Sequence, residues 1–598
     1  MPIQKYSVNQ HPIQTLLSWI NSSEIAIPEI QRPFVWDGVK VRDFIDSLYR
    51  GYPVGYLILW RNPNVRLKDG SISFGKRILI DGQQRITALM TSILGWEIVD
   101  KDYQKRRIKI AFHPVEKRFE VANPAIEKDK SWIKDISVVF SSDFRLYKMV
   151  DKYCQLNPSY KKEDIFESLE SLRGIVNNHI GLIELNSDLD IDTVNEIFVR
   201  INSAGVSLSQ ADFAMSKIAV NEKFGGMELR KAIDYFCHLA IKPEFYENLK
   251  KLDPDFTNTS YFQKMEWLKK ENDNLFDPKY TDMLRVAFTY KFKRGKLQDL
   301  VSLLSGRNFE TRAYEETIAE ESFNLLKEGI FDFMNENNFK TFLMIIRSSG
   351  FIDPEMIGSR NALNFSYILY LTLKNLDFNR ALIERLVRRW FVFSILTRRY
   401  SGSPESKFDY DIRQIHKIGP KEYLESVINA ELSEVFWDEA LPQQMNTSVA
   451  SSPFFNLYLA AQIIDNDRGF LSKEIKVKDL VEIKGDVHHV FPRQYLKKYN
   501  FSRGDYNQIA NYVMAQSEIN IAIGAKSPKV YFAEILEQCR SGKLKYGGID
   551  NEEDLFKNLE ENCIPKEIFE MEKDDYQRFL TLRRKLMAGK IKGYFERL

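Results

Sequence analysis

A chain of 598 residues is too long for one hydrophobic core, and its length predicts two to four domains. Hydrophobic residues make up 44% and charged residues 28%, which are the proportions of a globular protein and exclude a disordered or fibrous one. The net charge of +2 excludes nucleic-acid binding through bulk charge, so such binding must use local patches. The four cysteines are far apart and form no C-x-x-C pair, which argues against a disulfide framework or zinc ribbon and predicts a reducing cytoplasm: Cys154, Cys237, Cys539 and Cys563.

No segment of the chain predicts a membrane span or a signal peptide. The first six residues lack a basic region followed by an apolar one. Apolar runs such as Phe365–Leu373 and Trp390–Leu396 are far shorter than the ~20 residues that a transmembrane helix requires. We therefore expect a cytoplasmic protein with no membrane partner.

The N-terminal region predicts mixed helix and strand. Apolar residues at positions 13, 16, 17 and 20 have helical spacing, and Val41–Tyr49 predicts a second amphipathic helix. A turn leads into a strand at Tyr56–Trp60, and a strand at Arg77–Ile80 is followed by a helix at Ile86–Ile93. The basic segment 100–118 predicts a pair of strands.

The remainder of the chain predicts mainly helices. The helical pattern extends from about residue 190 to about 400, and Ser401–Ser406 is the best candidate for a linker. The expected fold class is α+β and multidomain. We predict a mixed α/β domain at 1–220, a largely helical connecting domain at 221–405 and a third domain at 406–598.

The first candidate site is the segment Asp81-Gly82-Gln83-Gln84-Arg85. A strand that turns into a helix at this point presents free backbone N–H groups to an anion. Arg85 can hold a phosphate with two hydrogen bonds, and Asp81 can hold a cation or a ribose hydroxyl. The alternative interpretation is an ordinary turn in which Asp81 caps the helix. The chain contains no G-x-x-x-x-G-K-[ST] loop, which excludes a P-loop nucleotidase.

Two other polar segments could line the same pocket. Gln31 and Arg32 precede a proline and two aromatic residues, and this arrangement suits either a pocket wall or a loop packed on the core. Arg200 and Asn202 precede a Ser-Ala-Gly turn between two predicted helices. They could face a ligand, although helix termination explains most of that segment.

The second candidate site is the histidine pair in the segment Asp486–Pro492. The chain contains only seven histidines, and two of them are adjacent here, at His488 and His489. Asn511 follows 22 residues after His489, and Asn520 follows nine residues after that. This order is typical of a one-metal nuclease site with a strand, a second strand and a helix. The alternative is a buried histidine pair that is satisfied by backbone carbonyls.

In such a site each residue would have a separate task. His489 would be the general base that activates water, and Asn511 would orient the loop that carries it. His488 and Asn520 would bind a divalent metal ion, and Asp486 would be a further ligand or would orient His488. Phosphate oxygens and water favour Mg²⁺ or Mn²⁺, whereas an imidazole ligand favours Mn²⁺ or Ni²⁺.

Two basic clusters could contact DNA or be solvated helix faces. One lies in residues 385–399, and the other is the C-terminal segment 571–598, which has eight lysines and arginines against four acids.

Together these motifs resemble the GmrSD-type, modification-dependent (type IV) restriction endonucleases and their BrxU-like or SspE-like phage-defence relatives. The Asp81–Arg85 segment, Gln31-Arg32 and the turn after Asn202 resemble the ParB-like N-terminal domain of that family. The histidine pair with Asn511 and Asn520 resembles its C-terminal His-Me finger (HNH) domain, although many HNH sites have an acid where this chain has His488.

The resemblance implies an endonuclease that cuts modified foreign DNA and uses a nucleoside triphosphate. It implies that Asp81, Gln84 and Arg85 serve nucleotide binding and hydrolysis, with Gly82 and Gln83 in the same pocket, and that His489 and Asn511 serve cleavage. The expected partner is double-stranded phage DNA. The sequence leaves open whether the nucleotide is ATP, GTP, CTP or UTP, and whether the chain is a monomer or a homodimer.

Three alternatives to this function remain. The chain could be a nucleotide-gated DNA-binding protein with a silent nuclease finger. It could instead be a nicking enzyme that senses a phosphorothioate backbone, or an enzyme that cleaves RNA.

Overall fold

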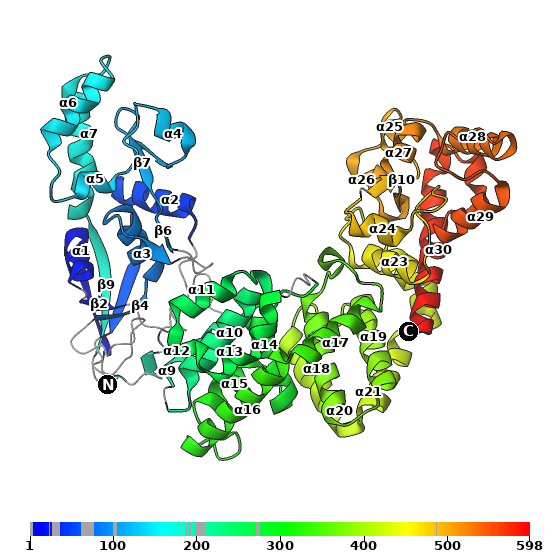
Figure 1. The fold of residues 1–598 in the computed structure, drawn as a ribbon, viewed down its shortest axis with the longest axis horizontal. Coiled ribbons are helices and arrows are strands. Elements are labelled where there is room, and N and C mark those ends of the chain that lie inside the picture. Colours follow the sequence, from blue (N-terminus) through cyan, green and yellow to red (C-terminus); the bar gives the residue numbers. More distant parts are fainter. Residues whose placement is uncertain are drawn as a thin grey trace. The chain divides into compact units, whose positions relative to one another are not determined.

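The computed structural model of the chain describes residues 4–22, 24–26, 36–60, 77–99, 105–186, 189, 193–194, 197, 210–221, 223–270, 275–485 and 487–598. It separates into two compact units, Met1–Arg230 and Lys231–Leu598, which we call the N-terminal and C-terminal units. Figure 1 shows the mixed N-terminal unit in blue and cyan and the mainly helical C-terminal unit in green to red. The architecture is α+β, in agreement with the predicted class.

The N-terminal unit is built on one five-stranded sheet with the order β1-β9-β3-β4-β2. The pairs β1/β9 and β3/β4 are antiparallel, and the pairs β9/β3 and β4/β2 are parallel. The five strands are β1 (Tyr6–Pro12), β2 (Ile25–Ala26), β3 (Tyr56–Trp60), β4 (Arg77–Asp81) and β9 (His179–Leu185).

Both faces of this sheet are apolar because the strand residues alternate between two cores. Leu57, Leu59 and Leu79 pack into a large core with the apolar faces of the neighbouring helices. Ile58 and Trp60 belong to a smaller core on the opposite face. The helices of the unit are α1 (Ile13–Asn21), α2 (Gly38–Tyr49), α3 (Gln83–Ser92), α4 (Pro124–Lys128), α5 (Ser137–Phe140), α6 (Leu146–Leu156), α7 (Lys162–Gly174), η1 (Ile175–Asn177) and α9 (Gln210–Val220).

The basic segment near residue 100 forms two hairpins where one strand pair was expected. β5 (Ile98–Val99) pairs with β6 (Lys105–Arg106), and β7 (Ile110–His113) pairs with β8 (Arg118–Val121). The expected strand pair is present as β7/β8, and the structure adds a second pair, β5/β6. Phe112 and Phe119 pack on each other with ring centroids 4.8 Å apart, and this tertiary contact fixes the second hairpin.

The C-terminal unit is helical from its start to residue 464. The boundary between the units falls within α10 (Gly226–Ile241). The helices that follow are α11 (Phe245–Leu252), α12 (Pro254–Thr257), α13 (Ser260–Lys264), η2 (Glu266–Lys270), α14 (Tyr280–Phe292), α15 (Leu297–Leu304), α16 (Glu316–Met334), α17 (Glu336–Arg347), η3 (Pro354–Met356), α18 (Arg360–Asn375), α19 (Arg380–Leu396), α20 (Pro404–Ile418), α21 (Pro420–Glu431), η4 (Phe436–Ala440), α22 (Leu441–Gln444) and α23 (Pro453–Ile464).

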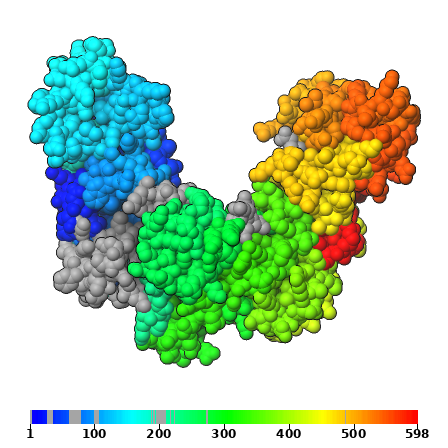
Figure 2. All heavy atoms as spheres, viewed as in Figure 1, coloured from blue at the N-terminus to red at the C-terminus, as the bar shows by residue number. Residues whose placement is uncertain are grey.

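The centre of this helical part is formed by α18 and α19. Every residue of α18 from Ala362 to Leu373 is buried, as is every residue of α19 from Trp390 to Leu396. Helices buried on all sides explain why these two segments are apolar without periodicity. Figure 2 shows the atoms of this helical part in green on the face turned to the viewer. Among the described residues, no helix combines the length and hydropathy that a membrane crossing requires.

The segment Ser401–Ser406 consists of three exposed residues, 401–403, and the first turn of α20, which begins at Pro404. On either side of these three residues, the buried Arg399, which follows α19, pairs with Asp411 of α20, with Nη2 and Oδ1 2.7 Å apart. The segment is therefore exposed, as its composition suggested, but the chain on its two sides is joined by a buried ion pair.

The last part of the unit carries the histidine pair. Its elements are α24 (Val477–Glu482), β10 (Val487–His489), α25 (Arg493–Lys497), α26 (Arg503–Tyr506), η5 (Ile509–Asn511), β11 (Tyr512–Met514), α27 (Ser517–Ile523), α28 (Pro528–Ser541), α29 (Glu552–Glu561), η6 (Lys566–Glu570), η7 (Lys573–Asp575) and α30 (Tyr576–Arg597).

Candidate active site

The histidine pair lies on a two-stranded sheet that is followed by a short helix. β10 and β11 are antiparallel, with His488 opposite Val513 and His489 opposite Tyr512. α27 begins three residues after β11 ends. We call residues 487–523 the ββα segment, because its elements follow the order strand, strand, helix.

The imidazole of His489 is held by a side chain that the sequence did not single out. Its Nε2 lies 3.0 Å from Oδ1 of Asn507. Because an amide oxygen only accepts hydrogen bonds, Nε2 carries the proton in this bond, and Nδ1 of the neutral ring keeps its lone pair. Burial lowers the pKa of His489; the bond to Asn507 opposes this shift, and the charge of Arg493 adds to it. The ring is therefore neutral at pH 7 and has one basic nitrogen, as a general base requires.

Asn511 fixes the path of the loop between the two strands. Its side chain is fully buried. Oδ1 accepts a hydrogen bond from the backbone N–H of Phe491 at 2.8 Å, and Nδ2 donates to the carbonyl of Phe491 at 3.1 Å and to that of Tyr506 at 3.0 Å. This buried amide stabilises the loop strongly, because removing it would leave several buried backbone groups without a hydrogen-bond partner. Asn511 thus holds the residues that directly follow His489.

Two side chains of the C-terminal helix α30 donate hydrogen bonds to carbonyls of the same loop. Arg583 is fully buried; its Nη1 donates to the carbonyl of Ala510 at 2.8 Å and its Nη2 to that of Asn562 at 3.2 Å. The hydroxyl of Tyr576 donates to the carbonyl of Asp505 at 2.9 Å. The sequence suggested a surface cation at position 583, and nothing in its spacing indicated this internal role.

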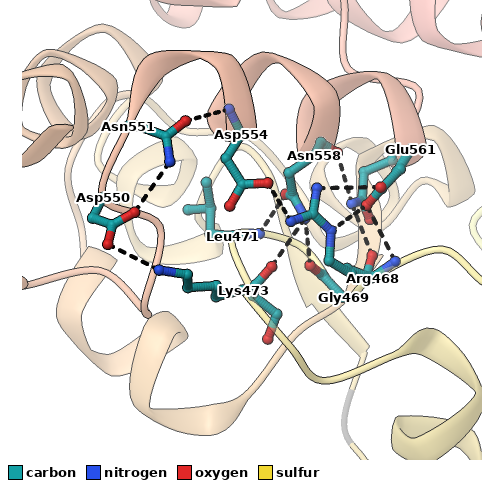
Figure 3. A network of polar contacts seen from close by, with 11 residues as sticks. Arg468, Gly469, Leu471, Lys473, Asp550, Asn551, Asp554, Asn558 and Glu561 are labelled. Atoms are coloured by element: carbon teal, nitrogen blue, oxygen red, sulfur yellow. Dashed lines mark hydrogen bonds and ion pairs between the residues drawn. The ribbon is translucent and has the colours of Figure 1, made fainter.

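A second polar network, centred on Arg468, lies next to β11. Arg468 is buried between Glu561, with Nε and Oε2 2.9 Å apart, and Asp554. The next residue but one, Phe470, donates its N–H to the carbonyl of Met514 at the end of β11. Figure 3 shows how this network joins the loop between α23 and α24 to α29 and the residues before it; the other labelled residues are Gly469, Leu471, Lys473, Asp550, Asn551 and Asn558.

The expected metal ligands lie on two elements of the ββα segment. His488 is 8% exposed on β10, and Asn520 is exposed on α27. Asp486 lies outside the described residues. Nowhere in the described part of the chain do three or more His, Cys, Asp or Glu side chains gather as a metal site. An imidazole nitrogen and an amide oxygen remain as donors, a set that suits a borderline divalent ion such as Mn²⁺ whose other positions are filled by water and phosphate.

In the N-terminal unit, Gly82 shapes the predicted anion-binding turn. β4 ends at Asp81, and Gly82 is the N-cap of α3 with a φ of 96°. Leu57 approaches so closely that a Cβ on Gly82 would lie 2.2 Å from its Cδ2. The helix therefore begins three residues earlier than predicted, and Gly82 caps it where the alternative interpretation placed Asp81.

Replacing Gly82 by alanine is expected to destabilise the N-terminal unit by about 1–3 kcal/mol from backbone strain, with the clash against Leu57 adding to this. Hydrogen exchange of peptides that cover residues 77–92 would measure the loss of protection. Gly51→Ala is the matched control, because Gly51 also has a positive φ of 70° but has nothing within 4 Å of a Cβ. Equal effects of the two substitutions would contradict the role of the Leu57 contact.

The polar side chains of this turn already have partners inside the unit. Arg85 Nη1 donates to the carbonyl of Tyr56 at 3.2 Å and lies 3.7 Å from Oδ2 of Asp81. Gln84 Oε1 accepts the backbone N–H of Trp36 at 3.3 Å. A phosphate bound by Arg85 would therefore compete with a backbone carbonyl.

Gln83 differs from its neighbours. Its side chain is 4% exposed, and its Oε1 is buried without a hydrogen-bond donor from the described residues. Buried acceptors are almost always paired in folded proteins, so this oxygen is suited to a donor on a ligand, such as a ribose hydroxyl or a base N–H. The other predicted pocket residues, Gln31, Arg32, Arg200 and Asn202, lie outside the described residues.

Comparison with known proteins bears on the N-terminal part most directly. An uncharacterized protein of Methanocaldococcus jannaschii is 21% identical over an alignment of 657 positions, which covers 97% of this chain and 98% of that protein. Residues 13–219 match the family described as "GmrSD restriction endonuclease, N-terminal domain". This match includes four of the five strands of the sheet, β2, β3, β4 and β9, and the Asp81–Arg85 turn, and it confirms the predicted resemblance for that region. The N-terminal part of the chain is therefore similar to a domain of restriction endonucleases, which indicates a DNA-cleaving enzyme of phage defence.

Proposed function

We propose that this chain is a metal-dependent endonuclease that cuts modified phage DNA under the control of a nucleoside triphosphate. The observation that carries the proposal is the setting of His489: a neutral imidazole on a ββα segment, with Nε2 bonded to Asn507, in a chain whose N-terminal part matches a restriction endonuclease domain.

His489 takes the proton of the attacking water at Nδ1. Asn507 keeps Nε2 protonated during this step and holds the ring in one orientation. Asn511 and Arg583 keep the loop after β10 in place, so the base stays aimed at the same point. The water oxygen then attacks phosphorus, and the bond from phosphorus to the leaving 3′ oxygen breaks.

His488 and Asn520 would hold the divalent ion, with Asp486 as a further ligand. When bound, such an ion stabilises negative charge on the scissile phosphate and on the leaving oxygen.

In the N-terminal unit, the Asp81–Arg85 turn would bind and hydrolyse the nucleotide. Arg85 would contact a phosphate and Gln84 would orient the attacking water, while Gln83 Oε1 would accept a hydrogen bond from the nucleoside. Gln31, Arg32, Arg200 and Asn202 would complete the pocket.

Cleavage of matched modified and unmodified phage DNA tests this function. We expect cutting of the modified DNA with Mg²⁺, Mn²⁺ or Ni²⁺ and one of the four nucleoside triphosphates, and none with EDTA. Asp81→Asn should remove nucleotide hydrolysis by breaking the pair with Arg85. Cutting that persists in EDTA, or hydrolysis that is unchanged in Asp81→Asn, would contradict the corresponding half of the proposal.

A further inference from the structure

The two basic clusters that the sequence suggested as DNA contacts are largely used inside the protein. In the cluster at residues 385–399, Arg399 is buried against Asp411, and Arg389 donates to the carbonyl of Phe595 at 3.1 Å. In α30 Arg583 is buried, and three further cations form ion pairs: Lys590 with Asp467, Lys592 with Glu434, and Arg597 with Asp465. These side chains are therefore not available as a surface for phosphates.

A different set of cations remains exposed beside His489. Arg493 and Lys497 lie on α25 and Arg503 lies on α26, and all three are exposed. Within the described residues, none of them has a carboxylate at ion-pair distance. We call these three residues the basic rim. Residues 487–514 contain four lysines and arginines and one acid, Asp505. The carboxylate of Asp505 accepts hydrogen bonds from the backbone N–H and the hydroxyl of Ser502 at the start of α26.

Ring contacts connect the basic rim to His489. Lys497 Nζ lies 5.7 Å from the ring centroid of Tyr506, which is 6.3 Å from that of His489. The ring of Tyr512 is 5.2 Å from that of His489 and perpendicular to it.

The charges of the other two rim residues act on the same group of rings. Burial raises the pKa of Tyr512, and the charge of Arg503 opposes this shift. Arg493 begins α25 four residues after His489, and Arg503 begins α26 three residues before Tyr506. The three cations therefore lie on the two short helices of the loop that joins His489 on β10 to Tyr512 on β11.

We propose that Arg493, Lys497 and Arg503 bind the backbone phosphates of duplex DNA on either side of the phosphodiester that is attacked by the water deprotonated by His489. This inference rests on the proposed cleavage function and adds its substrate-binding surface. Exposed cations without acid partners release the counterions of DNA when they bind phosphate, and they do not read sequence. The basic rim would thus place any duplex over His489 and leave the choice of modified DNA to other parts of the chain.

The test measures binding of a fluorescent duplex to the His489→Ala protein from 50 to 200 mM KCl. The variant Arg493→Gln/Lys497→Gln/Arg503→Gln should lower the slope of log K against log salt by roughly 2.7, at about 0.9 per phosphate contact, and should raise Kd at least ~10-fold at 150 mM. The control Lys543→Gln/Lys557→Gln/Lys566→Gln removes three exposed lysines of the same unit and should change Kd less than ~2-fold.

Because binding is measured without cleavage, the outcome separates this inference from the proposed function. If the variant lowers the slope but the wild-type protein does not cut DNA under any condition, the basic rim is supported and the proposed nuclease activity is refuted. An unchanged slope and Kd would overturn the rim even if the intact protein cuts DNA. If the triple variant loses binding of poly-glutamate but binds the duplex as before, the basic rim binds an acidic protein, and the proposal that it binds DNA is overturned.

Discussion

Replacing His489 by alanine is expected to abolish DNA nicking while nucleotide hydrolysis persists. A positioned general base contributes ~10²–10⁴-fold to a rate, and the neutral imidazole of His489, bonded to Asn507, is the proposed base. Relaxation of supercoiled plasmid under single-turnover conditions would measure the loss. Hydrolysis should persist because the proposed function assigns it to the Asp81–Arg85 turn, which belongs to the other unit.

Two further variants make this result specific. Asn507→Ala should slow nicking less than His489→Ala, because the base remains but its orientation and tautomer are no longer fixed. His179→Ala is the matched control; His179 is an exposed histidine at the start of β9 and should leave nicking unchanged. Full nicking by His489→Ala would refute the assignment of the base.

The order of elements could be predicted well from the sequence where local chemistry decides it. Helical spacing at positions 13–20 located α1, and the strand at Tyr56–Trp60 was predicted with its observed bounds. The start of α3 was predicted three residues late, because the positive φ of Gly82 depends on its close contact with Leu57. Such tertiary contacts do not appear in local periodicity.

In the candidate site too, residue types could be identified from the sequence, whereas tertiary contacts could not. The pair His488-His489 and the spacing to Asn511 predict a nuclease site from residue types alone, and the structure places His488 and His489 on β10 and Asn511 directly before β11. Asn507 could not be found in this way, since its bond to His489 depends on the path of the loop that α25 and α26 fold. Its charge predicts a surface position for Arg583, because charged side chains are rarely buried, whereas packing buries it with the carbonyls of Ala510 and Asn562 as its partners.

The largest loss of stability is expected from Asp411→Ala, which removes the acid at the centre of a buried network. Asp411 is fully buried, and the Arg399 side chain is 2% exposed. Two nitrogens of Arg399 donate to the two carboxylate oxygens at 2.8 and 2.7 Å, and the hydroxyls of Tyr400 and Tyr423 donate to the same oxygens at 2.8 and 2.7 Å. Removing the acid leaves the guanidinium in a low-dielectric site with Glu431 as its remaining ion-pair partner.

We expect a cost of about 3–5 kcal/mol, the usual penalty for an uncompensated buried charge. Hydrogen exchange of peptides from α19 to α21 would report it locally, which matters because a chain of two units does not unfold in one step. The double variant Arg399→Met/Asp411→Leu should regain most of the loss, since apolar side chains of similar volume can replace a buried pair at little cost. If Asp411→Ala kept wild-type protection, the network would not hold α19 to α20. If the double variant were as damaged as the single one, shape and not charge would account for the loss.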